Sequence, residues 1–119
     1  MPGAVLTRVG QTIVVTLQGD ADSETLAAAS IMLTEELQGH AARGVVFEVS
    51  GCEVIDVDEF SELLKLIQTV EWLGVTGVIA GLRPGLVAYL IAAGVSANAV
   101  RAALDLDQAL LEIDRVSDM

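Results

Sequence analysis

The fold of this chain is decided by residues 51–67, Gly51-Cys-Glu-Val-Ile-Asp-Val-Asp-Glu-Phe-Ser-Glu-Leu-Leu-Lys-Leu-Ile67. The first half of the stretch is typical of the tail of a buried strand, and the second half has the apolar spacing of an amphipathic helix. Asp56 stands at the join, where an Asp N-cap followed three residues later by Glu59 predicts a capping box. Asp58 and Glu59 add negative charge to the first turn, where exposed backbone N–H groups and the helix dipole favour it. We therefore expect the start of this helix to be a recognition point.

Apolar residues continue this helix pattern and form a similar one upstream. After the cap they recur at helical spacing on one stripe, which contains Val57, Phe60, Leu63, Leu64, Ile67 and Val70. The segment 23–39 has the same character, and its small alanines allow close approach to the rest of the fold. Its core side is expected to contain Leu26, Leu33, Leu37 and either Ile31 or Ser30.

Strand and helix patterns alternate along the rest of the chain. Strands are predicted in segments rich in β-branched or other apolar residues, at 4–8, 12–17, 44–49, 75–80 and 98–102. Helices are predicted at 23–39, from the Asp56 cap to about 72, at 84–94 and at 106–116. The first two strands should pair antiparallel through a turn, and the later alternation implies parallel crossovers. The predicted fold class is α/β, with a mixed sheet in the order β-β-α-β-α-β-α-β-α and helices packed mainly on one face.

The composition limits the classes of function. The chain has 119 residues and is 53% hydrophobic, but it contains only one Trp, one Tyr and two Phe, so a single core built from aliphatic residues is expected. A net charge of −11 argues against nucleic acid and anionic membranes, which require a basic surface, and fits either simple solubility or a basic partner. The single Cys52 excludes an internal disulfide, and its apolar flanks predict a buried, inert thiol. We see no leader pattern and no apolar run of bilayer length, so we expect a cytoplasmic protein.

Two segments resemble a known family. They are Gly44-Val-Val-Phe-Glu-Val-Ser-Gly-Cys-Glu-Val-Ile-Asp56 and Trp72-Leu-Gly-Val-Thr-Gly-Val-Ile-Ala-Gly-Leu-Arg-Pro84, with Gly94-Val95 further on. Their order and spacing resemble the STAS domain, the fold of anti-sigma-factor antagonists. The run that ends in Gly81-Leu-Arg-Pro84 is most similar to the scaffold and co-antagonist proteins of the stressosome. The resemblance covers almost the whole chain and predicts a single STAS domain over residues 1–119.

The resemblance implies a non-catalytic protein that binds a cognate serine/threonine kinase or an anti-sigma factor. It also implies assembly with other STAS proteins and with copies of itself. In the family the kinase phosphorylates a Ser or Thr directly after the Asp that ends the strand, which places nearly two negative charges at the helix N-terminus. Here that position is Val57, which has no hydroxyl and cannot accept phosphate.

This departure leaves three interpretations open. The affinity for the partner is fixed, or Asp58 partly imitates the phosphorylated state, or another hydroxyl replaces the missing one. That hydroxyl would belong to Ser61, one helical turn beyond Val57, or to Ser50 before the helix. Asp58 also has a purely structural explanation in the helix dipole. The residues expected to bind a partner are Asp56, Val57, Asp58, Ser61 and Arg83, the last either in an interface salt bridge or as a solvated loop residue.

Two alternatives to a regulator are weighed. Asp56-Val57-Asp58 resembles the Asp-x-Asp of phosphate-transferring hydrolases, which work with magnesium. Those enzymes also need a lysine and later carboxylates, whereas Lys65 lies within the helix pattern and no acidic pair follows Ala80. The other alternative is a STAS module that holds a small ligand in its apolar interior, although no phosphate-cradling loop is present. We expect no catalytic residue, no metal and no cofactor.

Overall fold

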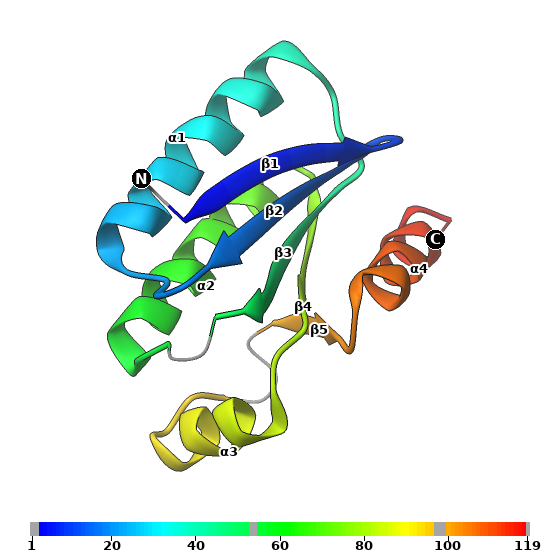
Figure 1. The fold of residues 1–119 in the computed structure, drawn as a ribbon. Coiled ribbons are helices and arrows are strands. Elements are labelled where there is room, and N and C mark those ends of the chain that lie inside the picture. The colour runs from blue at the N-terminus through cyan, green and yellow to red at the C-terminus, as the bar shows by residue number, and fades with distance from the viewer. Residues whose placement is uncertain (1–2, 53–54, 97–99, 119) are drawn as a thin grey trace.

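The computed structural model describes residues 3–52, 55–96 and 100–118. Figure 1 shows their arrangement. In chain order the elements are β1 (Ala4–Val9), β2 (Thr12–Gln18), α1 (Ser23–Gly39), β3 (Gly44–Gly51), α2 (Val57–Trp72), β4 (Thr76–Ala80), α3 (Pro84–Ala92), β5 (Arg101–Ala103) and α4 (Leu106–Ser117). The predicted α/β class and the predicted order of elements are confirmed.

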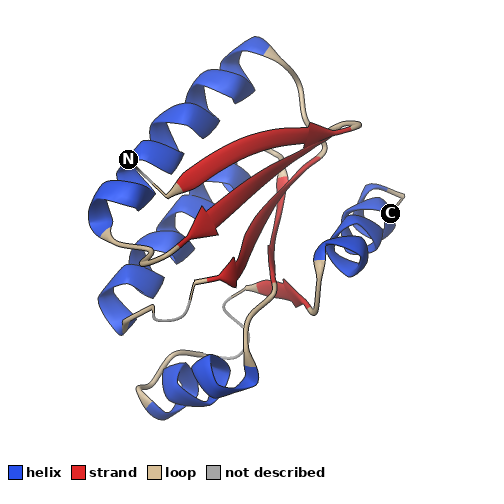
Figure 2. Cartoon of the chain, viewed as in Figure 1, coloured by secondary structure: helices blue, strands red, loops and turns tan. Residues whose placement is uncertain are grey.

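The strands form a single five-stranded sheet in the order β1-β2-β3-β4-β5 (Figure 2). β1 and β2 pair antiparallel, and their connecting turn contains Gly10 at φ 61°, a left-handed conformation that glycine adopts without steric cost. β3, β4 and β5 then add in parallel, each after a helix. The predicted hairpin followed by parallel crossovers is therefore correct.

Helices cover both faces of this sheet, with the larger part of the core on one side. A large cluster of buried side chains lies between the sheet and helices α1 and α2 (Figure 1). A smaller cluster on the opposite face joins Ala109 and Ile113 of α4 to Val14, Val46 and Val78 of the sheet. The prediction of helices mainly on one face describes α1 and α2, whereas α4 packs against the other side.

The path between β3 and α2 differs from the sequence prediction. β3 extends through Ser50 and Gly51, two residues beyond the strand predicted at 44–49, because a register shift lets Gln18 of β2 pair with Gly51. The strand ends where the Cys52 N–H donates a hydrogen bond back to the Val49 carbonyl, at 2.9 Å. Ile55 and Asp56 therefore lie in a connection and not in a strand tail, and residues 53–54 are outside the described residues.

Smaller corrections concern α1 and the end of the chain. Ile31 was offered as a core residue, but its side chain is 61% exposed because the buried stripe follows Leu26, Ala29 and Leu33. α3 ends at Ala92, two residues earlier than predicted. The short edge strand begins at Arg101, while part of its predicted span falls outside the described residues.

The attachment of α4 gives a test of the fold. Ile113 is fully buried, and a Cβ on Gly44 would lie only 2.6 Å from Ile113 Cδ1, so the two residues are in direct contact. We expect Ile113→Ala to lower the free energy of unfolding by about 2–5 kcal/mol, measured by denaturant titration with circular dichroism. Leu111→Ala on the same helix is the control: Leu111 is 68% exposed, and the expected change is within about 0.5 kcal/mol. Equal losses in both variants would contradict this placement of α4.

Candidate functional site

The start of α2 is fixed by a complete capping box. Asp56 Oδ1 accepts a hydrogen bond from the Glu59 N–H at 2.7 Å, and Glu59 Oε1 accepts one from the Asp56 N–H at 3.0 Å. The predicted cap is therefore confirmed. The Asp58 side chain, by contrast, forms no hydrogen bond or ion pair within the described residues, and the residue is exposed, so its charge faces solvent.

Four of the five residues predicted to bind a partner lie together at this tip of α2, and the fifth, Arg83, lies in the turn after β4. Asp56, Asp58 and Ser61 are exposed, and Val57 is partly buried. Beneath them, Ile55 and Phe60 are buried in the large core cluster and hold the first turn in place. The tip therefore presents carboxylates and one aliphatic side chain on a rigid base.

Arg83 connects the tip's neighbouring loops. Its Nη2 donates a hydrogen bond to the Ser50 carbonyl at 3.0 Å, which ties the turn after β4 to the end of β3. Gly81, at φ 85°, lies so close to Ser50 that a Cβ on Gly81 would be 2.8 Å from Ser50 Cβ. The sequence alternatives for Arg83 were an interface salt bridge or a solvated side chain, and this contact with a main-chain carbonyl was not foreseen. It gives Arg83 a positioning role within the chain.

The two serines considered as alternative phosphate acceptors have different surroundings. The Ser50 N–H donates to Glu48 Oε1 at 2.7 Å, and the Ser50 hydroxyl donates to the same oxygen. A phosphate on Ser50 would lose that bond and face the Glu48 carboxylate. Ser61 is exposed on α2, and its hydroxyl forms no hydrogen bond within the described part of the chain.

Cys52 lies beneath the same region as an unreactive thiol. Its side chain is fully buried, and Sγ donates to the Leu17 carbonyl at 3.4 Å. Burial, with smaller contributions from Glu48 and Asp20, raises the pKa of the Cys52 thiol to about 11. The thiol therefore stays protonated at neutral pH, which excludes it as a nucleophile.

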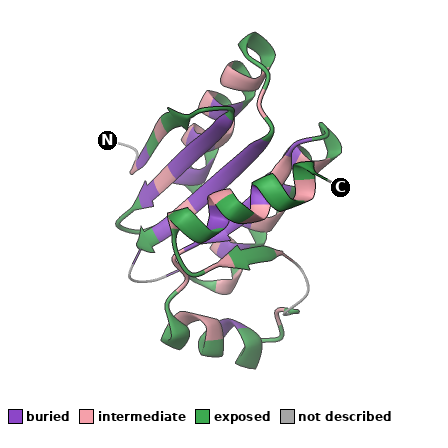
Figure 3. Ribbon diagram, turned by 90° about the vertical axis from the view of Figure 1, so that its right-hand side faces the viewer, coloured by how far each residue is buried: buried purple, intermediate pink, exposed green. Residues whose placement is uncertain are grey.

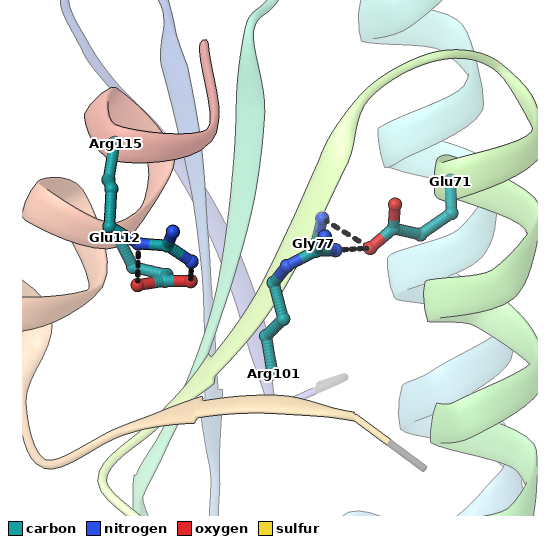
Figure 4. A network of polar contacts seen from close by, with 5 residues as sticks. All are labelled: Glu71, Gly77, Arg101, Glu112 and Arg115. Carbon is teal, nitrogen blue, oxygen red and sulfur yellow. Dashed lines mark hydrogen bonds and ion pairs between the residues drawn. The ribbon is translucent and has the colours of Figure 1, made fainter. Parts of the chain in front are cut away.

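The arginines are engaged inside the chain, a feature that sequence reasoning missed. On β5, Arg101 contacts Glu71 of α2 at 2.8 Å, and the same Glu71 oxygen accepts the Gly77 N–H at 3.3 Å (Figure 4). Arg115 pairs with Glu112 on α4. Two further arginine pairs of the described residues join Arg8 to Glu36 and Arg43 to Asp114.

These ion pairs do not neutralise the negative charge of the carboxylates at the tip of α2. Glu71 lies near the opposite end of α2 from Asp56, about 22 Å away at the usual helical rise. The carboxylates around the tip therefore face solvent with little neutralisation from arginine. The described residues contain no group of three or more His, Cys, Asp or Glu side chains arranged to hold a metal ion. None of the described helices has the length and apolar character needed to cross a membrane.

Comparisons with known proteins show what this chain is similar to. No protein-family model matches the chain. Over 109 residues it is 29% identical to the RsbT co-antagonist protein RsbRB of Bacillus subtilis (strain 168). The match covers 89% of this chain but 38% of that protein, so the chain spans less than half the length of its relative.

Solved structures agree with this match. A serine-to-glutamate variant of RsbS from Moorella thermoacetica superposes with a TM-score of 0.83 over 98% of each chain, at 23% identity. A chain in a structure of the stressosome, which is described as a signal integration and transduction hub, superposes with a TM-score of 0.73. It is 27% identical in sequence, and the match covers 97% of this chain and 100% of that one. The chain has the STAS fold of these structural neighbours. Within that class, its similarities are to the anti-sigma-factor antagonists and stressosome proteins, which confirms the resemblance seen in the sequence.

The capping box predicts a specific loss of stability. We expect Asp56→Ala to lower the free energy of unfolding by about 0.5–2 kcal/mol, because it removes the acceptor for the Glu59 N–H. Asp56→Asn is the matched control, since Asn caps about as well as Asp without the charge. Denaturant titrations at neutral pH compare the two. An Asn variant as unstable as the Ala variant would show that charge, and not the hydrogen bond, is responsible.

The buried thiol predicts a protected cysteine. In the folded protein Cys52 should resist iodoacetamide at pH 8, and it should react once guanidinium unfolds the chain. Because the folded pKa of about 11 lies above the ordinary value of 9.0, the thiol's contribution to stability is complete below pH 9 and is lost as the pH rises through 11. Cys52→Ala should remove both the labelling and this part of the pH dependence. Rapid labelling of the native protein would contradict the burial.

Proposed function

We propose that this chain is a non-catalytic protein–protein interaction module, acting as an anti-sigma-factor antagonist or a stressosome-like scaffold. It binds a serine/threonine kinase or an anti-sigma factor through the start of α2. The single observation that carries the proposal is the exposed acidic tip of α2. The resemblance assigns the family's phosphate-acceptor position to Val57 in this turn.

Several observations support a regulator over an enzyme. One relative is named as a co-antagonist protein, and a similar chain belongs to the stressosome, an assembly described as a signalling hub. In the Asp-x-Asp alternative both carboxylates would be needed for magnesium, yet Asp56 Oδ1 already accepts the Glu59 N–H. Lys65 is in the middle of α2, away from Asp56 and Asp58.

The geometry favours a fixed partner affinity over imitation of the phosphorylated state. Asp58 is one residue beyond Val57, which turns its side chain about 100° around the helix from the acceptor position. It also carries one negative charge, whereas a phosphate carries nearly two. The Asp58 carboxylate therefore matches a phosphate at position 57 neither in direction nor in charge.

The chemistry of the tip indicates the chemistry of its partner. Asp56, Asp58 and Glu62 are exposed there, and the chain as a whole carries a net charge of −11. A partner surface with arginine or lysine side chains complements these groups and is attracted to them before contact. Val57, which is partly buried in the same turn, offers an apolar contact beside these carboxylates. We propose that this recognition takes place in the cytoplasm and that other STAS proteins are further partners.

The missing acceptor can be restored. The cognate kinase, isolated on the immobilised chain, is incubated with labelled ATP and three proteins: the natural chain, Val57→Ser and Val57→Ala. We expect phosphate on residue 57 of the serine variant alone, located by mass spectrometry of the peptide, because its hydroxyl projects from the same exposed turn.

The controls separate the three interpretations. The alanine variant shows that loss of the valine side chain alone does not create a site. Phosphate on Ser61 of the natural chain would support replacement by another hydroxyl in place of fixed affinity. If the serine variant stays unlabelled while the kinase modifies a known substrate, the kinase is not the partner of this surface.

A further inference from the structure

The outer edge of β1 is an open strand edge. β1 is the first strand in the sheet order, so β2 is its neighbour on one side and no described strand pairs with the other. It has six residues, with neither proline nor lysine, and its pairing with β2 shows no bulge. Proteins usually protect such edges with charges, prolines or bulges, because the unpaired backbone groups accept another strand.

The direction of the backbone groups follows from the hairpin. The Gln18 N–H donates to the Gly3 carbonyl at 2.7 Å, so these two residues form a hydrogen-bonded pair. Hydrogen-bonded and non-hydrogen-bonded pairs alternate along an antiparallel ladder. The N–H and C=O groups of Ala4, Leu6 and Arg8 therefore point away from β2, toward the open edge.

The charged side chain of β1 is withdrawn from this edge. Arg8 Nε donates to Glu36 Oε1 at 2.8 Å, and its Nη2 donates to the His40 carbonyl at 3.1 Å, so the guanidinium is held on α1. The hydrogen bond from Arg8 lowers the pKa of Glu36, which keeps that carboxylate ionised and the pair neutral. The edge therefore carries no net charge in a chain whose net charge is −11.

The two faces beside the edge are apolar or uncharged. On the face opposite α1, the cross-strand pairs consist only of valine and threonine: Val5 with Thr16, Thr7 with Val14, and Val9 with Thr12. α4 crosses that face over β3, β4 and β5 and leaves β1 uncovered (Figure 3), and Val5 and Val9 are 53% and 45% exposed. On the α1 face, a hollow of about 220 Å³ is lined by Leu6, Thr7, Arg8, Ile13 and Glu36.

We propose that β1 pairs antiparallel with β1 of a second copy of this chain, around a two-fold axis at Leu6, to form one continuous sheet. Leu6 then lies opposite Leu6, Ala4 opposite Arg8, and Val5 opposite Thr7. The proposal deepens the scaffold function proposed above and rests on it for its biological role, whereas its geometry depends on β1 alone.

The surface favours a second copy because it is complementary to itself. Every outward N–H and C=O of Ala4, Leu6 and Arg8 gains a partner when the axis passes through Leu6. An axis at Thr7 would instead place Ala4 opposite Gly10, beyond the end of β1. The Leu6 side chains of both copies meet at the hollow beside α1, and the neutral edge brings no like charges together at the contact.

Disulfide trapping tests this register. At the axis the two Leu6 Cα atoms would be about 5.5 Å apart, a separation that a disulfide can span. Leu6→Cys should therefore form a disulfide-linked dimer under mild oxidation. Val9→Cys is the matched control on the same strand, because its two copies would be about 20 Å apart and should stay unlinked. Cys52 contributes little background because it is buried. Equal linking of the two variants, or linking of neither, would overturn the register.

Sedimentation of the unmodified chain tests the pairing itself. We expect a species of twice the 12.4 kDa chain mass, and we expect added salt to strengthen it by screening the repulsion between two acidic copies.

Leu6→Pro should give a monomer that keeps its circular dichroism, since the lost N–H points away from β2, whereas Leu6→Val should remain a dimer. A natural chain that stays monomeric at all salt concentrations overturns the pairing. Phosphorylation of the Val57→Ser variant by the kinase is measured separately. It shows whether the proposed function holds even where the pairing through β1 does not.

Discussion

The reciprocal hydrogen bonds between Asp56 and Glu59 are the interaction on which the candidate site depends. They satisfy two backbone N–H groups that a helix start would otherwise expose, and they fix the residue at which α2 begins. Because Phe60 and Leu63 are buried about one and two turns later, the start of the helix also sets which side chains face the core. The same register then places Val57, Asp58 and Ser61 at the surface, so the cap and the recognition surface are consequences of one local arrangement.

Charge in this protein is distributed by the tertiary structure. Arg8, Arg43, Arg101 and Arg115 each contact a carboxylate of the chain, and Arg83 holds the Ser50 carbonyl. Except for the pair of Arg115 with Glu112 within α4, these contacts connect segments that are distant in sequence, such as β5 with α2 and β1 with α1. They neutralise carboxylates beside the sheet and leave those at the tip of α2 to interact with a partner. An acidic chain can in this way have one strongly negative surface and, along β1, a neutral one.

Most of the fold was predictable because its signals are local. The capping box, the β-branched runs and the glycine turns act within a few residues, so each helix and strand was placed within a few positions of its true bounds. The extension of β3 through Gly51 was missed, because it depends on a register shift against β2. Ile31 was misplaced for a related reason: the helical pattern offered two stripes, and packing against the sheet selected the one through Ala29.

The sequence by itself determined the class of fold, the cap at Asp56 and the lack of a hydroxyl at Val57, since these depend on residue identity and short-range hydrogen bonding. Only the tertiary structure decided that Arg83 is bound to Ser50, that the Cys52 thiol donates to the Leu17 carbonyl, and that α4 covers β3 to β5 while β1 remains open. Those features require residues far apart in the chain to be brought within a few ångströms of each other. No pattern of neighbouring residues specifies such distances, because they result from how the helices pack on the two faces of the sheet.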